Sequence, residues 1–194
     1  MKKRDLTIGW TGLLIQMIMI AFGVYLGMLA NDWSTKRKEQ REVKNGLQSI
    51  ANEITFNKNF LEGRIEYYKQ VVTVLDSLIG VRGAEAPIEG IPGFRGINPI
   101  LLRNSAFELA QSTQVLANMD YQLAESLSLL YAVQDFQLKG VDKFLDGYVM
   151  GQVKDLGDFR MMFQNFTAMG EELLRFYTQV QPELPEPNTD VQIR

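Results

Sequence analysis

The sequence predicts an all-α protein in which a single N-terminal transmembrane helix continues into a long helix that packs in an extramembrane helical bundle. Three observations predict this class. Residues 8–30 form an uncharged apolar run, apolar residues recur every seven positions between 47 and 75, and no stretch alternates apolar and polar residues for long enough to form a sheet. The expected segments are a basic tail (1–7), the transmembrane helix (8–30), a long stalk and bundle helix (31–79), a Gly/Pro loop (80–98), the remainder of the bundle (99–181) and a disordered tail (182–194).

The apolar run is long enough to cross a lipid bilayer. At about 1.5 Å per helical residue it reaches roughly 35 Å, against a hydrocarbon core of about 30 Å. The residues expected to anchor it at the membrane interface are Trp10, Trp33, Lys36, Arg37 and Lys38. A cleaved signal peptide is the alternative. However, the run exceeds a typical h-region and Met28-Leu29-Ala30 is a poor cleavage site, so we expect an uncleaved, single-pass anchor.

Two rules disagree about which side of the membrane the body occupies. More Lys and Arg residues follow the run than precede it, and the positive-inside rule then favours a cytoplasmic body. A basic tail such as Lys2-Lys3-Arg4 in front of an apolar run normally stays inside, which favours a body outside. We expect the second orientation.

Charge is distributed unevenly along the rest of the chain. Residues 36–44 hold five basic and two acidic side chains, whereas the residues beyond them hold 12 basic and 19 acidic side chains, a net of −7. An acidic body is a poor binder of nucleic acid, so we expect no such partner. The basic collar suits either anionic lipid headgroups or an ordinary solvated helix turn.

The chain lacks the side chains that most enzyme sites use. It contains no histidine and no cysteine, which excludes Ser-His, Cys-His and the usual zinc chemistry. Two carboxylate pairs lie one helical turn apart, Asp142 with Asp146 and Asp155 with Asp158, and we expect them on a solvated face or at a helix start rather than in an acid/base couple. We therefore expect no catalytic residue, no metal and no cofactor.

A heptad repeat marks the long helix. Two rows of mostly apolar residues, each with a seven-residue spacing, run along this helix. Together they form a stripe of period 3.5, which is typical of a coiled coil or of a bundle seam. Asn57 and Arg64 interrupt the second row, and polar groups there cost stability but fix register. The first row is Leu47, Ile54, Leu61, Tyr68 and Leu75, and the second is Val43, Ile50, Asn57, Arg64, Val71 and Leu78.

Local signals predict the later helices. Five glycines and two prolines predict a loop over 80–98, and Asn98-Pro99 predicts a helix start. Ser105 to Glu108 reads as a capping box and Asn118 as the cap of a longer helix. A last helix is expected over about 158–180, and its residues expected to face the core are Phe159, Met162, Phe163, Phe166, Met169, Leu173, Phe176 and Tyr177.

One face of the apolar run suits helix association. Small residues let membrane helices approach closely, and a glutamine amide in hydrocarbon gains from a partner. Mere composition, or contact with another protein's helix, explains the pattern equally well. The candidate face consists of Gly12, Gln16, Gly23, Gly27 and Ala30.

The segment Leu29-Ala-Asn31-Asp-Trp33-Ser-Thr-Lys36-Arg37-Lys38 resembles the signature of a family of uncharacterised bacterial single-pass membrane proteins, which carry an Asn-(Asn/Asp)-Trp element at the end of the N-terminal transmembrane helix. Residues 104–131 are similar to a second patch of that family, although Ser112-Thr113 stands where the family has Ser-Gly. The resemblance implies a bacterial inner-membrane protein, with the body periplasmic in the expected orientation. The resemblance implies no enzymatic activity, because the family has no established one.

These observations favour a membrane-anchored helical interaction or scaffold protein, an accessory subunit that works by docking. Its expected partners are the lipid bilayer and either a second copy or another membrane protein. A membrane-tethered sensor of a small ligand and a carboxylate-only hydrolase are the alternatives.

Overall fold

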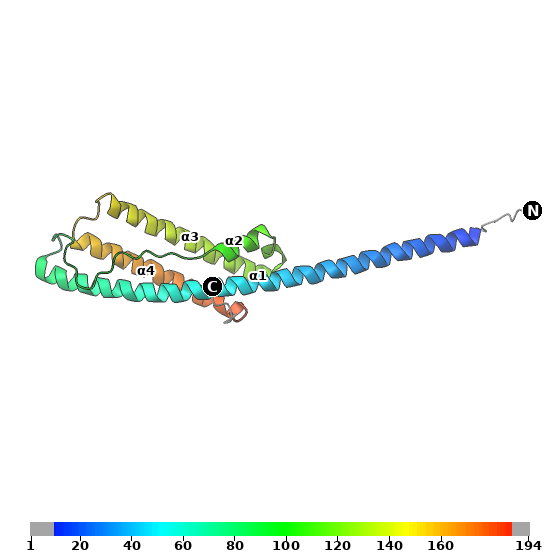
Figure 1. The fold of residues 1–194 in the computed structure, drawn as a ribbon, viewed down its shortest axis with the longest axis horizontal. Helices are drawn as coiled ribbons and strands as arrows, with labels where there is room; N and C mark the ends of the chain where they lie inside the picture. The colour runs from blue at the N-terminus through cyan, green and yellow to red at the C-terminus, as the bar shows by residue number, and fades with distance from the viewer. Residues whose placement is uncertain (1–9, 188–194) are drawn as a thin grey trace, which may run out of the picture. The chain divides into compact units, whose positions relative to one another are not determined.

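The protein is all-α, as the sequence predicts. The computed structural model describes residues 10–187, which form four helices and two short 3-10 turns and contain no strand. The chain divides into two compact units between Glu42 and Val43. In the second unit, α3 and α4 lie alongside the final part of α1 (Figure 1). The elements are α1 (Trp10–Arg82), α2 (Ser105–Ser112), η1 (Leu116–Asn118), α3 (Tyr121–Val149), α4 (Leu156–Val180) and η2 (Gln181–Glu183).

The first unit contains the apolar part of α1. Its most apolar 18-residue window has a mean hydropathy of 2.2, and none of that window is buried within the chain. Among the described residues, α1 is the helix that is long and apolar enough to cross a membrane. The expected basic tail (1–7) and the first two residues of the expected transmembrane helix lie outside the described residues.

In the second unit the heptad stripe is the seam of the bundle. Ile54, Leu61, Tyr68 and Leu75 are fully buried, and Asn57 in the second row is fully buried as well. Their neighbours in the core come from α3, α4 and the residues between α1 and α3. The chain therefore covers this stripe with its own later helices.

Helix α4 follows its sequence pattern closely. It begins at Leu156, two residues before the expected start, because the carboxylate of Asp155 accepts a hydrogen bond from the backbone N–H of Asp158 at 2.8 Å and caps the helix. Its aromatic residues pack edge-on against one another and against Tyr68 of α1. Six residues of the predicted core face are buried, namely Phe159, Met162, Phe163, Phe166, Leu173 and Tyr177, whereas Met169 and Phe176 are half-buried against the core.

The predicted helix start at Asn98-Pro99 is wrong. Helix α1 ends at Arg82, and residues 83–104, which we call the strap, run without helix to α2. Two tyrosines of α1 hold the strap, because the hydroxyl of Tyr67 donates to the carbonyl of Gly96 and that of Tyr68 donates to the carbonyl of Asn98, each at 2.6 Å. Asn98 has a φ of 49°, a left-handed conformation that cannot begin a helix.

Two predicted helix caps are also wrong. Asn104 and not Ser105 precedes α2, and its side chain donates to Glu108 at 2.7 Å instead of capping the helix. Asn118 lies in η1, while Asp120 caps α3 by accepting from two backbone N–H groups at 3.0 and 3.2 Å. Asp120 is the stronger cap because its carboxylate is charged and faces the helix N-terminus.

The predicted disordered tail is wrong for the part that the structure describes. Gln181–Glu183 forms η2, and Leu184 packs half-buried against the core. The amide of Gln48 donates to the backbone carbonyl of Glu186 at 2.8 Å, which ties residues 181–186 to α1. Residues 188–194 of the predicted tail lie outside the described residues.

Gly170 lets α4 lie close to α1. A Cβ atom at this buried position would lie 2.9 Å from Cγ1 of Ile65 and 3.8 Å from Cδ1 of Ile100 in the strap. Gly63 on the exposed side of α1 has nothing within 4 Å of the same position. The two glycines therefore differ in packing although both lie inside helices.

This contrast predicts opposite effects of alanine. We expect Gly170→Ala to lower the free energy of unfolding by about 1 kcal/mol, because overpacking against Ile65 outweighs the gain in helix propensity. Gly63→Ala should raise it by about 0.5–1 kcal/mol through propensity alone. Urea denaturation of both full-length variants measures the difference, and stabilisation of both would contradict the close approach at Gly170.

Candidate functional site

The candidate association face lies uncovered on the first part of α1. At 100° per residue, Gly12, Gln16, Gly23, Gly27 and Ala30 fall within an arc of about 60°. No atom lies within 4 Å of a Cβ built on Gly23 or Gly27. The structure therefore gathers the five residues on one side of the helix, and among the described residues nothing packs against the two central glycines.

The expected interface anchors are exposed side chains near the two ends of the apolar stretch. Trp10 is 84% exposed and Trp33 is 59% exposed. The guanidinium of Arg37 lies 3.7 Å from the centre of the Trp33 ring, and Lys38 forms an ion pair with Glu42 at 3.7 Å. Lys36 is exposed as well. Because Trp33 and Arg37 are one helical turn apart, the helix places the cation of Arg37 over the ring of Trp33.

Neither predicted carboxylate pair forms a reactive couple. Asp142 and Asp146 are exposed on α3. Asp155 caps α4, and Asp158 accepts a hydrogen bond from the backbone N–H of Lys154 at 3.1 Å. Each pair is expected on a solvated face or at a helix start, and the structure places the first pair on a solvated face and the second at the start of α4. No group of three or more acidic side chains in the described residues could hold a metal ion.

The buried carboxylate of the bundle is Glu53, which sequence reasoning missed. It is 6% exposed and lies on α1. Its Oε2 accepts from the hydroxyl of Ser105 at 3.2 Å and from the backbone N–H of Ala106 at 2.9 Å. Its Oε1 accepts from the hydroxyl of Tyr131 at 2.7 Å. Glu53 therefore supplies, from another helix, the negative charge that stabilises the N-terminus of α2.

Asn57, one turn further along α1, fixes the strap in a similar way. Its Oδ1 accepts from the backbone N–H of Arg103 at 2.9 Å and its Nδ2 donates to the carbonyl of the same residue at 2.8 Å. Gln134 of α3 donates to that carbonyl at 3.1 Å, and the hydroxyl of Tyr177 of α4 donates to Gln134. We call Glu53, Asn57, Tyr131, Gln134 and Tyr177 the buried polar layer.

Burial governs the protonation of the tyrosines in this region. Burial raises the pKa of Tyr131 far above its ordinary value, and the charge and hydrogen bond of Glu53 raise it further. Burial also raises the pKa of Tyr177 and of Tyr68 well above the usual range. These hydroxyls stay protonated as donors. The layer therefore holds α1, the strap, α2, α3 and α4 in register and offers no free acid or base.

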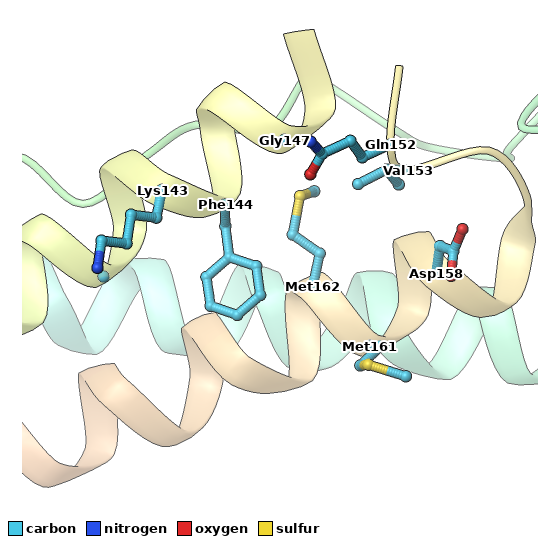
Figure 2. Close-up of a pocket in the computed structure, with 9 residues that line it drawn as sticks. Lys143, Phe144, Gly147, Gln152, Val153, Asp158, Met161 and Met162 are labelled. Atoms are coloured by element: carbon cyan, nitrogen blue, oxygen red, sulfur yellow. The ribbon is translucent and has the colours of Figure 1, made fainter. Parts of the chain in front are cut away.

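A pocket with a volume of about 410 Å³ lies between α3 and α4. Phe144 of α3 and Met162 of α4 point into the space between the helices, while Lys143 lies at one end and Asp158 at the other (Figure 2). The lining is mostly apolar. It consists of Gly140, Lys143, Phe144, Gly147, Gln152, Val153, Asp158, Met161 and Met162.

Removal of the Glu53 carboxylate should destabilise the bundle strongly. We expect Glu53→Ala to lower the free energy of unfolding by about 3 kcal/mol, because it leaves the Ala106 N–H and the Tyr131 hydroxyl without their acceptor. Glu53→Gln should cost less, since its amide still offers one acceptor. The matched control Glu108→Ala removes an exposed carboxylate and should cost about 0.5 kcal/mol. Equal costs in urea denaturation for Glu53→Ala and the control would contradict the buried cap.

The raised tyrosine pKa values predict alkaline destabilisation. A phenol whose pKa is raised by folding holds its proton more tightly in the native state, so its contribution to stability is complete below the ordinary pKa of 10.0 and is lost as the pH rises beyond it. Urea midpoints measured between about pH 8 and pH 11 should fall above pH 10, and fall less steeply in Tyr131→Phe. A midpoint that stays constant over this range in the wild type would contradict the burial of these hydroxyls.

No protein-family model, curated protein or solved structure matches the chain. Its function is therefore inferred from its residues and their geometry.

Proposed function

We propose that this chain is a membrane-anchored helical interaction protein, an accessory or scaffold subunit that works by docking and not by catalysis. One observation carries the proposal: the apolar stretch of α1 is wholly uncovered within the chain, whereas the bundle of the second unit has a complete core of its own. Apolar surface on that scale needs another apolar environment, which a bilayer supplies.

The residues around the apolar stretch support an anchor of this kind. Trp10 and Trp33 suit the two headgroup layers, and the pairing of Arg37 with Trp33 keeps a cation beside an aromatic ring at one of them. The resemblance of residues 29–38 to the bacterial family supports an inner-membrane location. The basic residues in front of the apolar run support a periplasmic body.

The geometry of the bundle also supports docking over catalysis. Glu53 is the one buried carboxylate among the described residues, and three donors already occupy it. A carboxylate-only hydrolase needs a second carboxylate beside it. Asp155 and Asp158 are engaged in starting α4.

The pocket between α3 and α4 favours a second function, a membrane-tethered sensor of a small ligand. Its volume suits a small molecule, and Phe144 and Met162 offer it apolar contacts. Lys143 and Asp158 at opposite ends would orient a ligand that carries charge. In this function, the binding of a ligand in the pocket would produce the signal, and a partner on the surface would not be needed.

For the anchor, we propose self-association through the face that contains Gly23 and Gly27. The chain has no cysteine, so a single Ser34→Cys substitution gives a clean site for disulfide crosslinking. Ser34 is exposed and falls within the same arc of α1 as the glycines.

We expect the Ser34→Cys chain to stay in bacterial membranes after alkaline extraction and to form a crosslinked dimer on oxidation. Adding Gly23→Ile and Gly27→Ile should reduce the dimer about tenfold, because bulky side chains keep the helices apart. Ala21→Ile, a small-to-large change on the opposite side of the helix, should leave it unchanged. Release by alkaline extraction would overturn the anchor, whereas a dimer insensitive to the double change would overturn the association face alone.

A further inference from the structure

Three arginines of the second unit lie over aromatic rings along one side of α1. The guanidinium carbon of Arg103 is 3.5 Å from the centre of the Phe56 ring. Those of Arg64 and Arg95 are 4.8 Å and 5.5 Å from the Phe60 and Tyr67 rings. We call these six residues the arginine–aromatic row.

The row is continuous because its α1 members share one face. At 100° per residue, the four residues from α1, which lie between positions 56 and 67, fall within an arc of about 80°. The Phe56 and Phe60 rings stack with their centres 6.3 Å apart. The strap brings the other two arginines to this face, since Asn57 binds the backbone of Arg103 and the Tyr67 hydroxyl accepts from the backbone N–H of Arg95 at 3.1 Å.

The positive charges of the row have no carboxylate partner. The ion pairs within residues 10–187 use Lys38, Lys69, Lys139 and Arg160, and none uses an arginine of the row. The Nε of Arg64 is buried and donates to nothing. Glu62 and Glu66 project from other sides of α1. Glu53, one turn before Phe56, falls on the same side as the row, but its carboxylate is buried and accepts from Ser105, Ala106 and Tyr131. The row is thus a local excess of positive charge on a strongly acidic body.

We propose that the arginine–aromatic row binds an acidic segment of a partner protein. A guanidinium offers paired donors that match a carboxylate, and stacking on a ring fixes the donor plane before the partner arrives. Less side-chain entropy is then lost on binding.

The length of the row indicates a peptide rather than a single small anion. Phe56 and Tyr67 are eleven residues apart on α1, which corresponds to about 16 Å along the helix axis. An extended peptide covers that distance with about five residues, and carboxylates on alternate positions would face the row.

This inference rests on the proposed docking function and names a surface and a class of partner for it. It does not depend on the association face, since the row lies entirely in the second unit. The binding experiment below can therefore fail while the membrane extraction and crosslinking results stand.

The test uses the full chain in nanodiscs of zwitterionic lipid and a fluorescein-labelled peptide of alternating glutamate and alanine. We expect fluorescence anisotropy to show binding that weakens as salt is added, and no binding of a glutamine–alanine peptide. Arg64→Gln with Arg103→Gln should weaken binding about fivefold, because the charge-assisted contacts of one half-buried and one exposed guanidinium are lost. Arg64→Lys with Arg103→Lys should weaken it less, since the charge remains but the paired donors are lost.

The matched control is Lys154→Gln with Arg175→Gln, which removes the same charge from two exposed side chains elsewhere on the bundle. This control should bind the acidic peptide as the wild type does. An equal loss in the control would mean that net charge alone attracts the peptide and would overturn the proposal. Binding to vesicles with anionic lipid, combined with no binding of the peptide, would overturn it too. Unchanged melting temperatures in all three double variants ensure that folding is not the cause.

Discussion

Burial of two polar side chains on α1 constrains the whole bundle. Glu53 and Asn57 lie one turn apart in the core, where an unpaired carboxylate or amide would cost several kcal/mol. Their bonds can be completed only if α2, the strap and α3 all reach their places, and Tyr177 adds α4 to the same layer. Apolar packing supplies the bulk of the stability, while this layer selects one arrangement of the helices from those that apolar packing would allow.

On the surface of the bundle, in contrast to its interior, some of the described charged groups have no polar partner. Inside, the described polar side chains of the layer bond to one another, whereas on the side of α1 that carries Phe56 and Phe60 three guanidiniums lie on rings without a carboxylate. Interior polar groups that are satisfied specify a fold, and exposed charges that are fixed in place but unpaired are available to a partner. The proposed binding of an acidic segment follows from that second condition, as the proposed anchor follows from an apolar helix with no cover.

Periodicity made the helices predictable. The heptad rows of α1 and the aromatic spacing of α4 each repeat over several turns, so the fold class, the buried face of α4 and the helical state of the apolar run could all be predicted. Helix boundaries were less predictable, because Asn98, Ser105 and Asn118 suit several local structures and tertiary bonds decide among them. Glu53 could not be found from its neighbours in sequence, since its partners lie 52 to 78 residues away. Asn57 could be found as a polar break in an apolar row. Its partner, the backbone of Arg103, could not be predicted from the sequence.

The long sequence separation within the polar layer also affects how the chain is synthesised. The Glu53 side chain meets its last partner 78 residues later, and the bond between Asn57 and Tyr177 spans 120. Helix α2 has eight residues, too few to persist alone before that closure. A nascent chain therefore cannot complete the polar layer until nearly all of α4 has been made, and until then part of the apolar seam on α1 lacks its cover.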